Sequence, residues 1–222
     1  PLLDMGPYYL TTLVSLLGPV AEVSARASTA RQTRVIGSGP RAGEPFPVEV
    51  PTHLAALIGF RGGTSAIGTF SFQANRPRVG VVEVNGTDGT LVLPDPNTFD
   101  GEVRIWREGM EDEAEAERHP ATGSTFSRGT GVVELARSIR AGRPERASGE
   151  IAFHVLDVML AIEASIGSGE TVEVTARRRV EPSNSGPRCV KCLTLWSTVT
   201  SSTEWRVGSV GCNQMHRPFV IS

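Results

Sequence analysis

This sequence has few lysines and cysteines, no long apolar run and almost no net charge. Each of these shortages excludes some classes of protein. The 222 residues include three cysteines and one lysine, Lys191, and the formal net charge at pH 7 is −2. A nearly neutral chain offers no strong attraction to nucleic acid or to an acidic membrane surface. No apolar run approaches the ~20 residues of a membrane span, and no basic segment precedes the first apolar residues, as a secretory signal would require. We therefore expect a cytoplasmic protein with no nucleic-acid and no membrane partner.

The first eighteen residues predict an amphipathic helix. Gly6-Pro7 is a helix-start signal, because proline is tolerated in a first turn, and Gly18-Pro19 is the matching stop. Apolar residues between them recur at helical spacing and predict a buried face: Leu10, Leu13, Val14 and Leu17. Polar residues repeat this spacing on the other side, and Asp4 lies one turn before them: Tyr8, Thr11, Thr12 and Ser15. The helix is expected to lie between a core and a polar cleft.

The middle of the chain predicts strands joined by tight turns. The segment 21–28 alternates polar and apolar residues, as a half-buried strand does. Glycines and prolines in 37–47 predict a loop, and six acidic residues in 108–117 predict a solvated loop. Turns at 61–64 and 85–89 make their flanking strands antiparallel, because parallel neighbours need a long crossover. The other strands expected are 53–60, 65–73, 79–84, 90–93, 103–106 and 171–175.

Two further amphipathic helices are expected after the strands. One has a short apolar stripe (Val132, Leu135, Ala136, Ile139), and the next has a longer one (Ile151, Val155, Val158, Met159, Ile162, Ile166). Ser148 is the expected N-cap of the longer helix, and Gly167 to Gly169 its stop. Helices that bracket hairpin strands predict an α+β domain, with helices packed on one face of a mostly antiparallel open sheet.

Several motifs resemble the C-terminal domain of the glucose-fructose oxidoreductase / inositol dehydrogenase (Gfo/Idh/MocA) family. The run Asp4-Met5-Gly6-Pro7-Tyr8 is similar to the Asp-x-Gly-x-His motif of that family, and segments 48–53, 85–99 and 143–157 continue the resemblance. It covers residues 1–180, which we expect to be the substrate and oligomerisation domain. The resemblance implies hydride transfer between NAD or NADP and a sugar, inositol or related polyol. It also implies an open sheet face through which subunits form a homo-oligomer.

The resemblance assigns roles to the first helix. In the family, a lysine of the cofactor domain, the motif aspartate and the motif histidine take up the hydroxyl proton and hold the oxygen as the carbonyl forms. Asp4 matches the aspartate, Tyr8 stands in place of the histidine, and Thr11 replaces a frequent second carboxylate. Since a phenol with an unperturbed pKa of about 10 is a poor base, Tyr8 is expected to bind or relay, and Asp4 to orient the substrate beside Thr11 and Thr12. The alternative is that Asp4 caps the helix and Tyr8 packs.

No cofactor-binding residue is expected in this chain. It contains no strand–GxGxxG–helix unit and no matching lysine motif, and the glycines at 37, 39 and 43 lack both the spacing and the following helix of a dinucleotide loop. The sequence therefore predicts a truncated product of a longer enzyme, inactive alone. A non-catalytic module that dimerises through its sheet or binds a ligand is the alternative.

The four histidines and three cysteines predict no metal site. His154 lies off the apolar stripe of its helix and is expected to make a structural hydrogen bond at a helix–sheet or subunit contact. Cys189, Cys192, Cys212 and His216 have the outline of a zinc site. They lie in 181–222, an atypical segment expected to be a poorly ordered, foreign or out-of-frame tail, so free thiols are the default and zinc the alternative.

Overall fold

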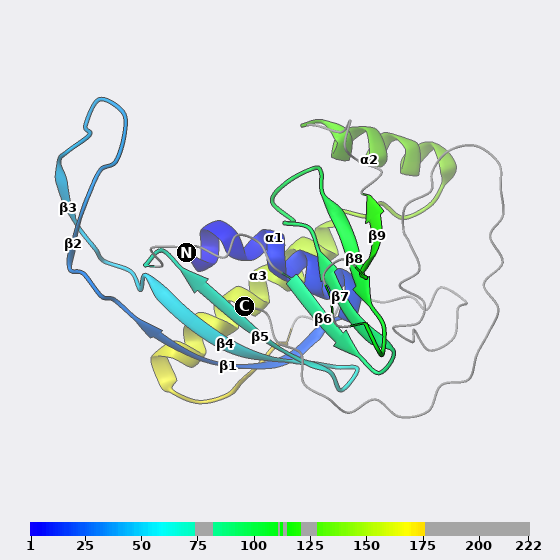
Figure 1. Ribbon diagram of the computed structural model, residues 1–222. Helices are drawn as coiled ribbons and strands as arrows, with labels where there is room; N and C mark the ends of the chain where they lie inside the picture. The colour runs from blue at the N-terminus through cyan, green and yellow to red at the C-terminus, as the bar shows by residue number, and fades with distance from the viewer. Residues whose placement is uncertain (74–81, 111, 113–114, 121–127, 176–222) are drawn as a thin grey trace.

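Three helices and ten strands make up the described part of the computed structural model, which comprises residues 1–73, 82–110, 112, 115–120 and 128–175 (Figure 1). Every pair of neighbouring strands in these ranges is antiparallel. The predicted α+β fold is confirmed. The tail predicted for 181–222, with its cysteines and His216, lies outside the described residues.

The first sheet has the strand order β10-β1-β4-β5, formed by Val172–Glu173, Val20–Ser28, His53–Phe60 and Ser65–Ser71. Helices α1 (Leu2–Leu17) and α3 (Gly149–Ser168) cover one face of it (Figure 1). Alternate residues of each strand point into the core beneath these helices. The residues between them, including Leu57 and Ile67, are exposed on the opposite face, which we call the open face.

The second sheet has the order β6-β7-β8-β9, formed by Val82–Gly86, Gly89–Leu93, Glu102–Trp106 and Glu117–Pro120. Val82 and Val84 are buried in the same core as the first sheet. Strand β9 was not predicted, because its sequence ends an acidic block that favours a loop. Ion pairs hold β9 in the sheet: Arg107 binds Glu117 through Nε at 2.6 Å and through Nη2 at 3.1 Å, and Arg118 binds Glu102.

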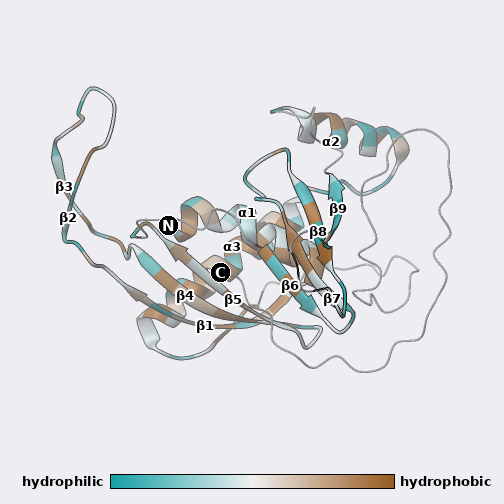
Figure 2. Ribbon diagram, viewed as in Figure 1, coloured by the Kyte–Doolittle hydropathy of each residue, from teal (hydrophilic) through white to brown (hydrophobic). Residues whose placement is uncertain are grey.

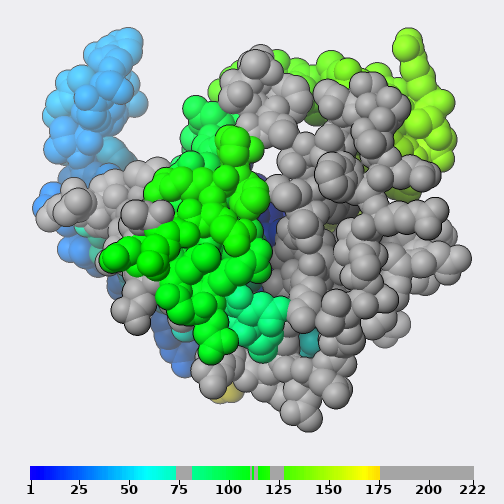
Figure 3. All heavy atoms as spheres, turned by 45° about the vertical axis from the view of Figure 1, so that its right-hand side comes forward, coloured from blue at the N-terminus to red at the C-terminus, as the bar shows by residue number. Residues whose placement is uncertain are grey.

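The segment between β1 and β4, residues 29–52, forms a projection that we call the arm (Figures 1 and 3). Its strands β2 (Thr33–Val35) and β3 (Pro45–Pro47) pair with one another, so the predicted loop at 37–47 is wrong at its end. Backbone bonds from Val48 N to Gln32 O, 2.9 Å, and from Ile36 N to Glu44 O, 3.0 Å, use even-numbered residues. The prolines at 45 and 47 therefore face the free edge, the one place where a strand loses nothing by lacking N–H donors.

Helix α1 begins at Leu2, four residues before the predicted start, and Pro7 lies inside it. Leu2 and Gly6 are buried and extend the apolar stripe towards the N-terminus. A Cβ on Gly6 would come within 3.1 Å of the Met159 sulfur, so α1 approaches α3 closely at this point. This packing outweighs the hydrogen bond that Pro7 cannot make.

Helix α3 has the predicted ends. The Ser148 side chain accepts a hydrogen bond from Ile151 N at 3.2 Å, and Gly169 closes the helix with φ 80°. Among the described residues, α3 is the one helix long and apolar enough to cross a membrane, judged by length and composition alone. Its hydrophobic residues (Figure 2) include the buried stripe that packs on β1, and core helices meet the same criterion.

Helix α2 (Thr130–Ala141) forms where predicted, but its apolar stripe is exposed. The most exposed residues are Val132 and Ile139, at 70% and 71%. Polar contacts hold the helix instead: Glu134 accepts hydrogen bonds from the Ser138 hydroxyl at 2.8 Å and from Arg143 Nη1 at 3.0 Å. The predicted helix is confirmed, and its stripe does not join the core.

Two side chains of α3 bind the backbone of β1. His154 Nε2 accepts a hydrogen bond from Val20 N, and Ser165 Oγ accepts one from Ala25 N, both at 2.9 Å. Eleven residues of helix and five of strand both span about 16 Å, which lets the two elements run side by side between these bonds. The predicted structural role of His154 at a helix–sheet contact is confirmed. Its predicted position off the buried stripe is wrong, since it is 1% exposed.

Replacing His154 by leucine is expected to lower the free energy of unfolding by about 1–3 kcal/mol, because Val20 N–H would remain buried without an acceptor. Urea unfolding followed by circular dichroism measures this loss. His119→Leu is the control and should change stability by less than about 0.5 kcal/mol, since its imidazole lies on the surface near Glu117. Equal effects of the two substitutions would contradict the assigned role.

Candidate functional site

The polar stripe predicted for α1 is present as one continuous row. Asp4 and Tyr8 are exposed, the latter by 45%, and Thr11 and Thr12 are half-buried. Because α1 begins at Leu2, Asp4 lies within the helix, one turn from Tyr8, at a spacing that sets Cβ atoms about 5–6 Å apart. The carboxylate and the phenol can therefore contact one small polar molecule together.

The N-cap position of α1 is occupied by Pro1 rather than by Asp4, and Tyr8 projects from the helix. Asp4 lies in the first turn, where a carboxylate also benefits from the helix dipole. Thr12 Oγ1 donates to Tyr8 O at 3.0 Å, so its proton is engaged within the helix. Thr12 can therefore offer a ligand only its oxygen lone pairs, whereas Tyr8 keeps its hydroxyl available at the surface.

Tyr9, which the sequence did not single out, anchors a loop beside the stripe. Its hydroxyl donates to Asp95 Oδ1 at 3.1 Å, and its ring meets Phe70 edge-on at 6.3 Å. Burial, and then the hydrogen bond and charge of Asp95, raise the pKa of Tyr9 to about 12. Asp95 also accepts from Asn97 N at 2.9 Å. Tyr9 is thus a fixed donor that holds the β7–β8 loop against α1, and it keeps its proton at neutral pH.

The described residues offer no cradle for a dinucleotide. Gly37, Gly39 and Gly43 lie at the tip of the arm between β2 and β3, with no helix after them to bind phosphate. No group of three or more His, Cys, Asp or Glu suited to a metal ion occurs in the ranges that the structure covers. Neither a phosphate-binding loop nor a metal cluster therefore accompanies the α1 stripe within the described ranges.

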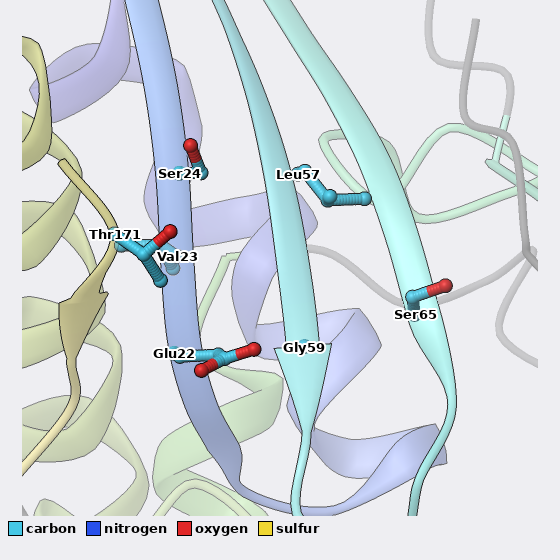
Figure 4. Close-up of a pocket in the computed structure, with 7 residues that line it drawn as sticks. All are labelled: Glu22, Val23, Ser24, Leu57, Gly59, Ser65 and Thr171. Carbon is cyan, nitrogen blue, oxygen red and sulfur yellow. The ribbon is translucent and has the colours of Figure 1, made fainter. Parts of the chain in front are cut away.

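A hollow of about 120 Å³ lies on the open face of the first sheet (Figure 4). Its lining comprises Glu22, Val23, Ser24, Leu57, Gly59, Ser65 and Thr171. Helix α1 packs on the opposite face, so this hollow and the α1 stripe are separate features. The hollow is too small and too far from Asp4 to hold the same substrate.

The chain is similar to known oxidoreductases. Residues 1–92 match the model of the GFO/IDH/MocA C-terminal domain. An NAD binding oxidoreductase from Klebsiella pneumoniae aligns with 24% identity and a TM-score of 0.63 over 79% of this chain and 51% of its own. An oxidoreductase domain protein from Kribbella flavida aligns with 25% identity and a TM-score of 0.57, over 78% of this chain and 51% of its own. Levoglucosan dehydrogenase, in complex with NADH and levoglucosan, aligns with 18% identity and a TM-score of 0.60, over 78% of this chain and 50% of its own.

These matches concern one domain of longer proteins. The chain spans about half the length of the solved structures that it resembles. No curated protein sequence matches it. The family match and the shared fold agree with the motif at the start of α1 and with the antiparallel sheet behind it. Over residues 1–92, the chain is therefore similar to a C-terminal domain of the GFO/IDH/MocA family.

Proposed function

We propose that this chain is the substrate-facing half of an NAD(P)-dependent dehydrogenase that acts on a sugar, inositol or related polyol. The observation that carries the proposal is the exposed row of Asp4 and Tyr8 on a helix whose other face is locked into the core. A rigid helix holds polar groups more accurately than a loop does. The levoglucosan and L-sorbose complexes of levoglucosan dehydrogenase support a sugar as the class of substrate.

In this proposal the α1 stripe binds the alcohol while a separate domain supplies the nicotinamide, which accepts the hydride. Asp4 accepts a hydrogen bond from a substrate hydroxyl and orients the carbon that is oxidised. Tyr8 donates to or accepts from the reacting oxygen and acts as a binder or relay rather than as the base. Thr11 and the free lone pairs of Thr12 bind further hydroxyls, and the base comes from the cofactor domain.

We also place the open sheet face at a subunit contact of a cytoplasmic homo-oligomer. Leu57 and Ile67 expose 52% and 38% of their surface at the middle of this face. Covering these apolar side chains with another subunit would remove them from water, which is favourable. This feature also favours the second candidate, a non-catalytic module that dimerises through its sheet. The two candidates differ in whether the α1 stripe takes part in chemistry.

Calorimetric titration of this chain with NADH is expected to give no binding signal, because the described residues provide no phosphate cradle. The discriminating protein is a chimera in which the part of the Klebsiella oxidoreductase that this chain does not cover is joined before Pro1. The chimera should bind NADH and reduce NAD with a sugar or polyol, followed at the absorbance of NADH. Tight binding of NADH by the chain alone, or an inactive chimera that binds NADH and folds, would count against the dehydrogenase.

A further inference from the structure

The loop between β7 and β8, residues 94–101, lies beside α1 and is closed on itself (Figure 1). A turn forms near its start, where Asp95 O accepts hydrogen bonds from Thr98 N at 3.0 Å and from Thr98 Oγ1 at 2.9 Å. At its base Gly101 has φ 116°, and a Cβ there would come within 2.5 Å of Pro94 Cβ. The two ends of the loop therefore meet, and these contacts fix its shape.

The carboxylate of Asp95 is the polar centre of this loop, and only one of its oxygens is engaged. Oδ1 accepts hydrogen bonds from the Tyr9 hydroxyl at 3.1 Å and from Asn97 N at 2.9 Å. The second of these bonds forms an Asx-turn, which needs a single oxygen. Oδ2 accepts no hydrogen bond from any residue that the structure describes, and the side chain is half-buried. This oxygen is thus a charged acceptor held in a fixed direction, and charge-assisted hydrogen bonds are roughly twice as strong as neutral ones.

Helix geometry places the Asp95 carboxylate on one flank of the α1 stripe. Successive residues of an α-helix point about 100° apart, so Tyr9 points about 100° round the axis from Tyr8. Thr12 points about 40° from Tyr8 on the side of Tyr9, and Asp4 about 40° from Tyr8 on the other side. Since the Tyr9 hydroxyl contacts Asp95, the two carboxylates lie on opposite sides of Tyr8. A molecule bound at Tyr8 and Thr12 therefore has one edge towards Asp4 and the other towards Asp95.

The two carboxylates define the kind of molecule that fits between them. An ionised carboxylate only accepts hydrogen bonds, so a ligand that satisfies both Asp4 and Asp95 must carry at least two hydroxyl donors. A sugar or a polyol meets this requirement, whereas an alcohol with one hydroxyl can satisfy only one carboxylate. The arrangement thus favours a substrate with further hydroxyls beside the one that reacts.

We propose that Asp95 is a further substrate-binding residue, whose Oδ2 accepts a hydrogen bond from a hydroxyl other than the one that is oxidised, and that Tyr9 is the positioning residue that holds it. This inference rests on the proposed function and adds a second side to its substrate site. The Tyr9 ring packs edge-on against Phe70, which fixes the direction of its hydroxyl. The hydroxyl at Asp95 is unchanged by the reaction, so this contact is equally strong before and in the transition state. Its loss therefore raises KM and leaves kcat unchanged.

The test uses the chimera with the Klebsiella cofactor domain, saturating NAD, and myo-inositol or levoglucosan, whichever is oxidised faster. Asp95→Asn is expected to raise KM roughly tenfold or more at nearly constant kcat. Asparagine keeps the oxygen that Tyr9 and Asn97 contact, so the turn remains, but it replaces the free acceptor by an N–H donor. The matched control is Asp100→Asn, which removes the same charge from the same loop at an exposed position. It should leave both constants unchanged.

Tyr9→Phe tests the positioning role. It removes the donor to Asp95 Oδ1 and keeps the ring against Phe70. It is expected to raise KM by roughly threefold to tenfold, the effect of one neutral hydrogen bond. Combined with Asp95→Asn it should add little, because residues that act through one contact are not additive. A full additional loss in the double variant would show that Tyr9 does not act through Asp95.

The outcomes separate this inference from the proposed function. An active chimera in which Asp95→Asn keeps the wild-type KM, or in which Asp100→Asn raises KM as much, overturns the Asp95 contact and leaves the dehydrogenase. Saturation-transfer NMR of the same polyol with the NADH-loaded chimera measures binding without turnover. Binding that depends on Asp95 without any oxidation overturns the dehydrogenase and leaves the contact, and the lack of both overturns both. Circular dichroism melts verify the fold of each variant, and if Asp95→Asn does not fold, the KM of Tyr9→Phe decides.

Discussion

Replacing Gly89 by alanine is expected to lower the free energy of unfolding by about 3–5 kcal/mol and to open the second sheet. Gly89 begins β7 with φ 144°, a conformation that L side chains rarely adopt. A Cβ at this position would overlap the Trp106 carbonyl oxygen and lie 3.0 Å from its carbon and 3.2 Å from Arg107 Cα. These are backbone atoms at the end of β8 and just after it, which cannot rotate away. Backbone strain and overpacking cost about 1–3 kcal/mol each.

Gly63→Ala is the matched control for the Gly89 substitution. Gly63 also has a positive φ, 84°, but a Cβ there would meet nothing within 4 Å. It should therefore cost only about 1 kcal/mol, the price of the backbone conformation alone. Urea unfolding compares the two variants, and hydrogen exchange of the β7 and β8 amides locates the damage. If Gly89→Ala costs no more than Gly63→Ala, the close approach of β8 to the turn is not as described.

Local pattern was enough to predict the elements whose own residues alternate between core and solvent. Strand β4 alternates from Leu54 to Phe60, and its short turn into β5 leaves antiparallel pairing as the only arrangement. Helix α3 carries its start and stop signals in Ser148 and Gly169. These features depend on neighbours a few residues apart, so a single sequence contains them.

The features that the sequence did not predict depend on distant partners. Strand β9 begins at the end of an acidic block, and it pairs because Glu102 of β8 binds Arg118 and Arg107, just after β8, binds Glu117. Strand β3 contains two prolines and is possible only because both face a free edge. Helix α1 begins earlier than predicted because Leu2 joins the core and Gly6 lies against Met159, on a helix far along the chain.

The candidate site also combines a feature that depends on neighbouring residues with one that depends on a distant partner. The shared face of Asp4 and Tyr8 follows from their four-residue spacing, and the sequence predicted it. The link from Tyr9 to Asp95 joins residues 86 positions apart, and no local signal predicts it. The only hint was the turn-forming run around Asp95, which marks a loop whose place in space the sequence leaves open. The sequence thus predicted that Asp4 and Tyr8 share one exposed face, and the structure added the loop that Tyr9 holds beside it.

Replacing Asp4 by asparagine in the chimera with the Klebsiella cofactor domain is expected to reduce kcat/KM for the sugar or polyol roughly a hundredfold. Asparagine keeps the size of the side chain but loses the charge that strengthens a hydrogen bond from the substrate hydroxyl. Positioned polar groups of this kind contribute about 10²–10³ to a rate. Stability should change little, because Asp4 is exposed and lies in the first turn of α1, where its charge adds at most about 1 kcal/mol.

The loss of kcat/KM in the Asp4→Asn chimera must be compared with its affinity for NADH, which fluorescence titration measures. If Asp4 acts on the substrate, kcat/KM falls while NADH binds as before, and Ser15→Ala on the same exposed row has no effect on either quantity. Tyr8→His supplies the imidazole that a phenol replaces in the resembling motif, and it should raise the rate at neutral pH, because an imidazole titrates near pH 6.5 whereas a phenol stays protonated. An Asp4→Asn chimera with full activity would remove Asp4 from the chemistry and leave the orientation of the substrate to other groups.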